Sequence, residues 1–489
     1  LVYVLAGRLT GDRLVGLIAA LVFGLHPVHI EAVAWISAVN EPLMSIFFLL
    51  SLLCYSSQMI KETGTVDPIV ASGTRRCSRK WMALSLVCYA LALLTKETAL
   101  VLPVIIFSFG VFFPKTESLE TRPLSRRLRY AALSAIPYLL LSGVYLAVRI
   151  AALGAVAPTI KNVSVSTVLY SIPSILLFYA RMLVWPVGVS MYSDRAPVIV
   201  PGLWNFFVPL AAVLVMAGVV YLLYRRWQNE GVRRLFLFSM IWIIVPLLPA
   251  MNLSGYYTTE IGHDRYLYLA SFGFSLIAAL IVRRLPSTRA KLLGYPALQA
   301  AVVLILIISL GIGTALQHSF WKDDVTFYSH GVRIAPNNPF ARTGLADTMY
   351  GRQRFSEAGE QYEQVIALDP RQWHSQYRLG LIYNRFGHPQ EAEQCFRRAI
   401  AINTNSASVH LYLGLALYDL GQIDQSIDEL RQALEINADT PNAHYGIGIG
   451  LRRQGDLLGA LREFRAELEK SPEHPEAKKQ IASIDEKLK

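Results

Sequence analysis

Cysteine is scarce in this chain: four of its 489 residues are cysteines. No two of them show C-x-x-C spacing; Cys54, Cys77 and Cys88 fall in or beside apolar segments, and Cys395 stands far from them. A disulfide framework or a cysteine-rich zinc site requires closer and more regular spacing. We therefore expect neither in this protein.

Charged residues are also few, 17% of the chain, whereas 53% of the residues are hydrophobic. A soluble globular protein is usually less apolar, and a protein embedded throughout in a membrane carries fewer charges. Apolar runs close to membrane-spanning length continue to about Gln317, and none follows it. The sequence therefore predicts an all-α protein with a multispanning membrane domain at 1–318 and a soluble second part.

The net charge of +11 raises the question of nucleic-acid binding. Most lysines and arginines of the first half, however, lie in short loops between apolar runs. Such loops mark the cytoplasmic side of a membrane protein. We therefore interpret the positive charge as an orientation signal, and we expect no nucleic-acid partner.

The first apolar run, Leu1 to Gly7, is far too short to cross a membrane. The positive n-region and small-residue cleavage site of a signal peptide are not recognisable either. We expect this run to be the end of a spanning helix that begins upstream, with the first helix and the first outer loop of the domain missing.

Nine further apolar segments are expected to cross the membrane. They are Leu14–Leu25, Leu43–Tyr55, Trp81–Leu94, Ala99–Phe113, Tyr130–Ile150, Leu203–Tyr224, Leu235–Ala250, Tyr266–Val282 and Leu298–Leu316. Another segment, Val168 to Trp185, is apolar enough to cross, but a crossing there would break the alternation of basic loops. We expect it to lie along the outer interface or to dip in and return.

The unusual polar residues all fall on the face opposite the basic loops. That outer face carries His26–Pro42, Thr95–Thr98, Gly154–Gly202, Asn252–Arg265 and everything after Gln317. We therefore expect an integral, multi-pass membrane protein whose soluble part lies on the periplasmic or endoplasmic reticulum lumenal side. The sequence does not choose between these two membranes.

A 34-residue period runs through the soluble part, and its markers are Pro336, Pro370, Thr404, Ala438 and Pro472. The residues of the second period follow the tetratricopeptide pattern. They are Leu379, Gly380, Tyr383, Gly387, Ala392, Phe396 and Ala399. The sequence predicts a linker at 319–336, four such units at 337–472 and a capping helix at 473–489.

An array of this kind normally binds a peptide or protein in its concave groove, and we find no catalytic set of residues in it. Three histidines, His374, His410 and His444, recur near the same repeat position. Because each lies about one repeat from the next, we interpret them as solvent-facing or groove-lining rather than as metal ligands.

Ionisable residues of the membrane half converge on its outer face, where they mark a functional site or a paired structural one. They are His26, His29, Glu31, Glu41, Lys96, Glu97, Arg149, Glu260, His263, Asp264 and Arg265. The first two histidines and Glu31 suit a metal, an acid/base or positioning role, or the water-facing side of an interfacial helix. Because H-x-x-H-x-E lacks a fixed zinc spacing, we predict no metal site and leave a divalent cation as an open cofactor.

Three cations of this group suit a phosphate. Arg149 and Arg265 lie at the ends of expected spans, where arginine is often only an anchor, but with Lys96 they supply the donors that a lipid-linked phosphate requires. Lys96 and Glu97 have a second interpretation, in which they pair with neighbours and hold a tight turn. The aromatic tract at 256–273 either stacks on a sugar or lies at headgroup level.

Five segments, in order, resemble one known family. They are HPVHIEAVAWISAVNEPL, LLTKETALVLP, VYLAVRIAALG, HDRYLYLASFGF and FWKDDVTFYSHGVRIAPNNP. Together they resemble the GT-C glycosyltransferases with tetratricopeptide repeats, namely the transmembrane and tetratricopeptide-repeat O-mannosyltransferases and their bacterial relatives, over essentially the whole chain. The resemblance implies transfer of a sugar, typically mannose, from polyprenyl or dolichyl phosphate to a protein hydroxyl at the outer membrane face, with inversion.

The resemblance also implies residue roles. The catalytic residues that line the site would be His26, His29, Glu31 and Glu41. The residues that bind the donor phosphate would be Arg149, Arg265 and Lys96. Supporting residues would be Glu97, Asp264 and Tyr266. The repeats would bind the acceptor polypeptide. The family's main acidic motif, expected to supply the general base, would lie upstream of Leu1, and Val39 stands where relatives often carry arginine.

The sequence also allows two other classes of function. One is a membrane-anchored repeat scaffold whose enzyme-like half does not catalyse. The other is a transporter, which would place ionisable residues near the middle of the bilayer and show internal repeats in the membrane half. Neither transporter feature is clear in the sequence, so sugar transfer is the leading hypothesis and the scaffold its alternative.

Overall fold

The computed structural model describes residues 1–62, 74–113, 123–154, 163–251, 262–287, 289–292 and 294–488, without the side chains of 37, 58–62, 74–78 and 250. It divides into two compact units, Leu1–Asp323 and Asp324–Lys489. Within the described ranges the chain is helical apart from one short hairpin of β1 (Lys291–Leu292) and β2 (Tyr295–Pro296). The all-α prediction is therefore confirmed.

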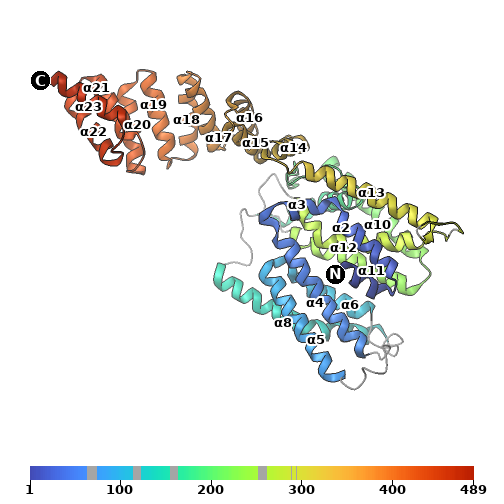
Figure 1. The fold of residues 1–489 in the computed structure, drawn as a ribbon. Coiled ribbons are helices and arrows are strands. Elements are labelled where there is room, and N and C mark those ends of the chain that lie inside the picture. The colour runs from blue at the N-terminus through green and yellow to red at the C-terminus, as the bar shows by residue number, and fades with distance from the viewer. Residues whose placement is uncertain are drawn as a thin grey trace. The chain divides into compact units, whose positions relative to one another are not determined.

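The first unit is a bundle of apolar helices (Figure 1). In chain order they are α1 Val2–Thr10, α2 Arg13–Leu25, η1 Pro27–His29, α3 Ile30–Ala34, η2 Ile36–Ala38, α4 Asn40–Glu62, α5 Thr74–Thr95, η4 Glu97–Val101, α6 Leu102–Phe112, α8 Leu124–Leu153, α9 Val165–Val184, η5 Leu203–Phe207, α10 Val208–Arg226, α11 Glu230–Ile244, η6 Val245–Leu247, η7 Pro249–Met251, η9 Asp264–Tyr266, α12 Leu267–Arg283 and α13 Ala297–Ser319.

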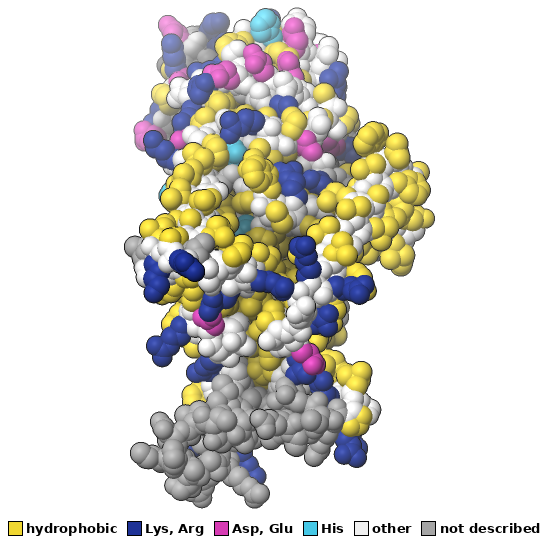
Figure 2. Space-filling view, turned by 90° about the vertical axis from the view of Figure 1, so that its right-hand side faces the viewer, with side chains coloured by type: hydrophobic (Ala, Val, Ile, Leu, Met, Phe, Trp, Pro, Cys, Tyr) yellow, Lys and Arg dark blue, Asp and Glu magenta, His cyan; other side chains and the backbone are white. Residues whose placement is uncertain are grey.

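Five of these stretches are long and apolar enough to cross a membrane: α8, α9, η5 with α10, η9 with α12, and α13. Helix α2 and the η1–α3 segment together would form a sixth such stretch. The two parts are bent by 54° relative to each other. Of the other expected spans, two fall within α4 and α5. The span expected at Ala99–Phe113 covers part of η4 and all of α6, and that at Leu235–Ala250 runs from α11 through η6 into η7. The chain is thus an integral membrane protein, and Figure 2 shows hydrophobic side chains spread over a wide part of its surface.

Helices α2 and α12 pack against each other in opposite directions. At one end His29, just after α2, hydrogen-bonds Ser271 near the start of α12. At the other end Asp12, which caps α2, pairs with Arg283 at the end of α12. We call these the site end and the basic end of the first unit.

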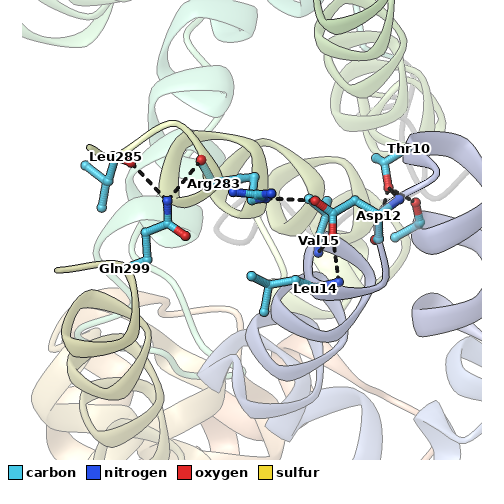
Figure 3. A network of polar contacts seen from close by, with 8 residues as sticks. Thr10, Asp12, Leu14, Val15, Arg283, Leu285 and Gln299 are labelled. Carbon is cyan, nitrogen blue, oxygen red and sulfur yellow. Dashed lines mark hydrogen bonds and ion pairs between the residues drawn. The ribbon is translucent and has the colours of Figure 1, made fainter. Parts of the chain in front are cut away.

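The basic end is held by a small polar network (Figure 3). Asp12 accepts hydrogen bonds from the backbone of Leu14 at 2.8 Å and from Arg283 Nε at 2.7 Å. Gln299, at the start of α13, donates to the carbonyls of Arg283 and Leu285. Further arginines at the helix termini of this end are Arg8, Arg13, Arg225, Arg226 and Arg284. Basic residues of the first unit therefore gather at this end.

Helix α13 runs from the basic end to the site end. Its C-terminal part meets the end of α2, because Thr314 Oγ1 donates to the carbonyl of Leu25 at 2.7 Å and Gly313 lies close against Pro27. The chain therefore leaves the first unit on the side where the site lies.

Helix α9 keeps to the site end along most of its length. Its C-terminal half packs Phe178 and Met182 into a cluster with Val28 and Leu267, both of which lie at the site end. Its N-terminal half contacts the segment that leads into α10, where the rings of Tyr170 and Phe206 are 5.6 Å apart. By length and composition α9 is one of the helices that could cross a membrane, so its expected position along the outer interface stays a prediction.

The second unit is a row of paired helices (Figure 1). They are α14 Asp324–Ile334, α15 Pro339–Gly351, α16 Phe355–Leu368, α17 Trp373–Arg385, α18 Pro389–Ile402, α19 Ala407–Asp419, α20 Ile423–Ile436, α21 Ala443–Gln454, α22 Leu457–Lys470 and α23 Pro475–Leu488. Helices α15 to α22 form four consecutive pairs, and α23 packs on the last of them. The stretch predicted as a linker contains α14, which packs its Tyr328 ring against Gly344 of α15.

Small residues allow the two helices of a repeat to approach closely. A Cβ atom at Gly380 of α17 would lie 2.6 Å from the Phe396 ring of α18, which is itself fully buried. Gly380 and Phe396, two residues of the repeat pattern, thus pack directly on each other.

Candidate functional site

The site lies where the chain bends between α2 and α3. Here His26 has an extended backbone, and its Nδ1 accepts a hydrogen bond from the backbone of Val28. That assigns the proton to Nε2, which donates to the carbonyl of Leu183 at 2.9 Å. Because both nitrogens are engaged and the side chain is buried, His26 ties the end of α9 to the bend.

His29 is also buried and engaged. Its Nε2 lies 2.8 Å from Ser271 Oγ, which itself donates to the carbonyl of Tyr268, so the histidine is the donor. The rings of Phe23 and Tyr268 pack against it at 4.6 and 4.5 Å. Over the part of the chain that the structure describes, no three histidine, cysteine or acidic side chains gather closely enough to hold a metal ion.

Glu31 is almost fully buried, with 1% of its surface exposed. Its Oε2 accepts a hydrogen bond from the backbone of Arg265 at 3.1 Å, and its Oε1 lies 3.4 Å from Arg265 Nη1. His263 Nδ1 lies 4.0 Å from the same Oε1. Burial, followed by the charge of Arg265, lowers the pKa of His263 to about 3, so this histidine is neutral and Arg265 is the cation that Glu31 meets.

The guanidinium of Arg265 lies between two aromatic rings. It is 5.2 Å from the centre of the Trp35 ring and 5.5 Å from the centre of the Tyr266 ring. Both distances suit cation–π attraction, which holds the guanidinium plane in place. Trp35, the residue at which α3 ends, was not singled out from the sequence.

The Tyr266 ring also meets a second cation. Lys96 Nζ lies 5.4 Å from the centre of this ring and forms an ion pair with Glu41, the second residue of α4. Glu41 is buried, which raises the pKa of its carboxyl group, while the charge of Lys96 opposes that rise. Lys96 and Arg265 therefore lie on a shared aromatic side chain, each with a buried glutamate.

Glu97 and Arg149 form the third ion pair of the site, with Oε2 and Nη1 3.5 Å apart. Arg149 also donates to the Tyr145 hydroxyl at 2.8 Å. The Glu97 side chain is 48% exposed, so among the three paired glutamates it is the one that water or a ligand reaches most readily. Its neighbour Lys96 links this pair to the Glu41 pair along the chain.

Hydrogen bonds deeper in the bundle explain why these residues share one end. Tyr138 and Ser142 of α8 hydrogen-bond Ser85 and Tyr89 of α5, each at 2.6 Å. They hold α5 and α8 side by side in the same direction, so that Lys96 and Arg149, which follow these contacts in sequence, arrive together.

Asp264 connects the site to the loop after α9. Its side chain is fully buried, and its Oδ2 accepts a hydrogen bond from the backbone of Ser190 at 2.9 Å. Ser190 and the nearby Arg195 were not expected as site residues, because no sequence motif distinguishes them from other loop residues. Glu260, which the sequence placed in the cluster, lies outside the described residues.

The structure thus brings nine of the ten predicted site residues into contacts around the bend and the starts of α4, η4 and α12, and Arg149 joins them through Glu97. The two histidines are held as structural donors, whereas Lys96, Arg149 and Arg265 are cations, each beside a glutamate. Such an arrangement holds three cationic side chains in defined positions at the site end. Lys96 pairs with Glu41 and Glu97 with Arg149, which is compatible with both of their predicted roles.

Comparison with known proteins supports both halves of this description. The tetratricopeptide repeat family matches residues 343–407, and the family described as TPR repeat matches residues 414–455. Among solved structures, that of MamA is 26% identical and covers 30% of this chain and 86% of its own, with a TM-score of 0.29. The family matches confirm the predicted tetratricopeptide repeats.

Similar full-length proteins are named as protein O-mannosyl-transferases. One from Caenorhabditis elegans is 28% identical over 357 residues, which cover 72% of this chain and 46% of that protein. Mouse TMTC2 is 24% identical, and the match covers 73% of this chain and 49% of that protein. Mouse TMTC3 is 22% identical, and the match covers 80% of this chain and 43% of that protein. The expected resemblance is confirmed, and the chain spans about half the length of the relatives it matches.

Proposed function

We propose that this chain, a relative of the protein O-mannosyl-transferases, transfers mannose from a polyprenyl- or dolichyl-phosphate donor to the hydroxyl of an acceptor protein. The observation that carries the proposal is the pair of cations on one tyrosine. Lys96 and Arg265 lie at 5.4 and 5.5 Å from the Tyr266 ring, each anchored by a buried glutamate. Two fixed cations at a membrane surface suit a phosphate that becomes more negative as the sugar leaves it.

The reaction forms one bond and breaks one. The acceptor oxygen bonds to the anomeric carbon of the sugar while the bond from that carbon to the phosphate oxygen breaks, and attack from the opposite side inverts the centre. The acceptor proton passes to a carboxylate, and the electron pair of the broken bond stays on the lipid phosphate. Positively charged side chains lower the barrier because charge develops on the departing phosphate.

The structure suggests how the work is divided among the residues. Arg265 and Lys96 would hold the phosphate, with Arg149 at the side of the half-exposed Glu97. Glu31 and Glu41, each beside its cation, would position those cations. His26 and His29 would keep the bend in shape through their hydrogen bonds.

The direction of the helices supports an outer-face reaction with the repeats on that side. Arginines gather at the basic end, which the positive-inside rule assigns to the cytoplasm, so the site end would face the periplasm or the lumen. Because α13 ends at the site end, the repeat unit begins on that side. We propose that the repeats bind the acceptor polypeptide, as tetratricopeptide arrays commonly bind peptides.

The test is transfer of radiolabelled mannose from polyprenyl-phosphate-mannose to a peptide by the chain in membranes. Arg265→Ala should lower transfer at least a hundredfold, since it removes a cation from the departing phosphate. Arg283→Ala is the matched control, because Arg283 also pairs with a carboxylate but at the opposite end of α12. Equal transfer by both variants would contradict the proposal. EDTA should leave transfer unchanged, because we propose no metal.

A catalytically inactive repeat scaffold is the second candidate. Its support is that Glu31 with Arg265 and Glu41 with Lys96 form self-contained pairs, which stabilise a fold without any reaction. In this case the chain would bind peptides but transfer no sugar from any lipid-linked donor, and Arg265→Ala would change stability alone.

A further inference from the structure

Two further arginines lie beside the site, on α9 and on the loop that follows it. Arg181 is in the last turn of α9, where its Nη2 donates to the carbonyl of Val187 at 2.6 Å. Arg195 is half-buried, and its guanidinium carbon lies 4.5 Å from the centre of the Phe178 ring. Neither guanidinium is in an ion pair with any acidic residue of the described ranges.

These two positive charges are close enough to act on each other. Burial, followed by the charge of Arg181, lowers the pKa of Arg195. Arg195 lies over the Phe178 ring, and Arg181 follows Phe178 by three residues on α9, so the two residues share one face of that helix. The same ring also lies close to Gly262, just before the site. Two neighbouring guanidinium groups repel each other unless an anion lies between them or near them.

Asp264 is the carboxylate whose charge acts on Arg195, but it forms no ion pair with this arginine. Asp264 influences the pKa of Arg195, yet its side chain is fully buried and its Oδ2 is taken by the backbone of Ser190. Arg195 has five N–H donors and, within the described part of the chain, no carboxylate to receive them. The donors are therefore available to a ligand that approaches from outside.

The surroundings of the two arginines indicate where such a ligand would come from. Large apolar side chains beside them are mostly exposed, with exposed fractions of 57 to 75%. They are Val184, Trp185, Val187, Ile199 and Val200. In a membrane protein, exposed apolar side chains and tryptophan on a helix at the interface insert among lipid chains at headgroup level.

We propose that Arg181 and Arg195 form a second anion-binding site, whose ligand is the phosphate group of an anionic membrane lipid. Guanidinium groups bind phosphate oxygens with paired N–H donors, and the apolar side chains around them fit the acyl region of the same lipid. The site is separate from Lys96 and Arg265, but the Ser190–Asp264 hydrogen bond joins its loop to the sequence segment that carries Arg265. A bound lipid would therefore stabilise the loop that supports the first site.

This inference does not depend on sugar transfer, and lipid retention tests it directly. The whole chain is placed in phosphatidylcholine nanodiscs that contain phosphatidylglycerol. The protein is then released from the nanodiscs, and native mass spectrometry counts the phosphatidylglycerol molecules that stay bound to it. The variant is Arg181→Gln with Arg195→Gln. The control is Arg397→Gln with Arg431→Gln, which removes the same charge from exposed positions of the repeat unit.

The double variant should bind phosphatidylglycerol about tenfold more weakly than the parent, and the control should match the parent. Arg181→Lys with Arg195→Lys should recover part of the binding, because lysine binds phosphate as a point charge. Equal retention by parent and double variant would overturn the proposal. Loss of phosphatidylcholine to the same degree would also overturn it, since it would show adsorption to apolar surface without recognition of the anion.

Two further controls keep the result interpretable. Circular dichroism and the thermal midpoint must match between parent and variant, and if the double variant fails to fold, Arg195→Lys and Arg195→Gln are compared instead. Inorganic phosphate at millimolar concentration should displace little of the lipid. If inorganic phosphate displaced the lipid and bound with the same affinity as phosphatidylglycerol, the assignment to a membrane lipid would be overturned.

Discussion

Glu31 and Arg265 lie 3.4 Å apart, although 234 positions separate them in the chain. Glu31 stands in the short helix after the bend, and Arg265 stands just before α12 begins. A carboxylate that accepts a hydrogen bond from the backbone N–H of one residue and forms an ion pair with its guanidinium holds the two segments in a defined arrangement. The site therefore depends on a contact between distant parts of the chain, and several measurable consequences follow from it and from similar contacts.

Replacing Glu31 by glutamine should destabilise the first unit by about 3 kcal/mol, because removing one partner of a buried ion pair leaves the other charge uncompensated. The measurement is the thermal midpoint of the chain in nanodiscs. Glu230→Gln is the control, because Glu230 pairs with Arg234 at an exposed surface. An unchanged midpoint for Glu31→Gln would show that the 3.4 Å pair contributes little.

Glu41 should make stability depend on pH in a defined direction. Burial raises the pKa of its carboxyl group in the folded chain, so the folded state binds the proton more tightly than the unfolded state. Its contribution is present in full below the ordinary glutamate pKa and is lost as the pH rises through the raised value. The midpoint of the parent minus that of Glu41→Gln should therefore fall as the pH increases over this window.

Lys96→Met provides the companion test for Glu41. Removal of the cation leaves burial unopposed, so the fall of stability with rising pH should become steeper in Lys96→Met than in the parent. If both curves have the same slope, the pair does not govern the titration of Glu41.

Asp12→Ala should lower the free energy of unfolding by about 1 kcal/mol, because α2 loses its N-terminal cap. Asp12→Asn should keep most of the cap and lose only the ion pair with Arg283.

The same residue should make stability depend on pH. Burial alone would raise the pKa of Asp12, but hydrogen bonds from Arg283, Leu14 and Val15 together lower it. The carboxylate therefore contributes stability above its ordinary pKa, and this is lost as the pH falls through the lowered value. Midpoints of parent and Asp12→Asn should converge in acid; a constant difference would contradict this.

Gly380→Ala should destabilise the repeat unit by about 1–3 kcal/mol, because its Cβ would lie 2.6 Å from a fully buried Phe396 ring. Gly359→Ala is the control, since its Cβ would meet Ile382 and Leu379 at ordinary distances of 3.8 and 3.9 Å. Alanine is the better helix former, so this variant should be as stable as the parent or more so, by up to about 1 kcal/mol. Hydrogen exchange of α17 and α18 in the whole chain measures both.

Much of the fold was predictable because its signals are local. The 34-residue period located four helical pairs, since a repeat that packs only on its neighbours must repeat its packing residues. Apolar runs located the membrane helices because every backbone polar group in a bilayer must bond within its own helix. Helix α14 was missed, because its sequence lies before the first repeat marker and follows no repeat pattern.

The candidate site was predictable only as a set of residues. Placing an ionisable side chain in a membrane domain costs free energy, so such a residue is rarely there without a role. On this ground Glu31, Glu41, Lys96 and Arg265 could be identified from the sequence. Their partners were not, because Glu41 meets Lys96 and Glu31 meets Arg265 through the packing of helices distant in sequence. Trp35 and Arg195 gave no signal, since an aromatic or basic residue in a loop has many ordinary roles.

The sequence by itself determined the all-α class, the repeat array and the face on which the polar residues gather, because periodicity and hydrophobicity act over short stretches of chain. The tertiary structure alone decided which charge meets which. A glutamate and a cation can be recognised anywhere in a chain, but their pairing depends on distances that only the packed helices create. For this reason the two histidines became structural donors, and Lys96 and Arg265 came to lie on the same Tyr266 ring.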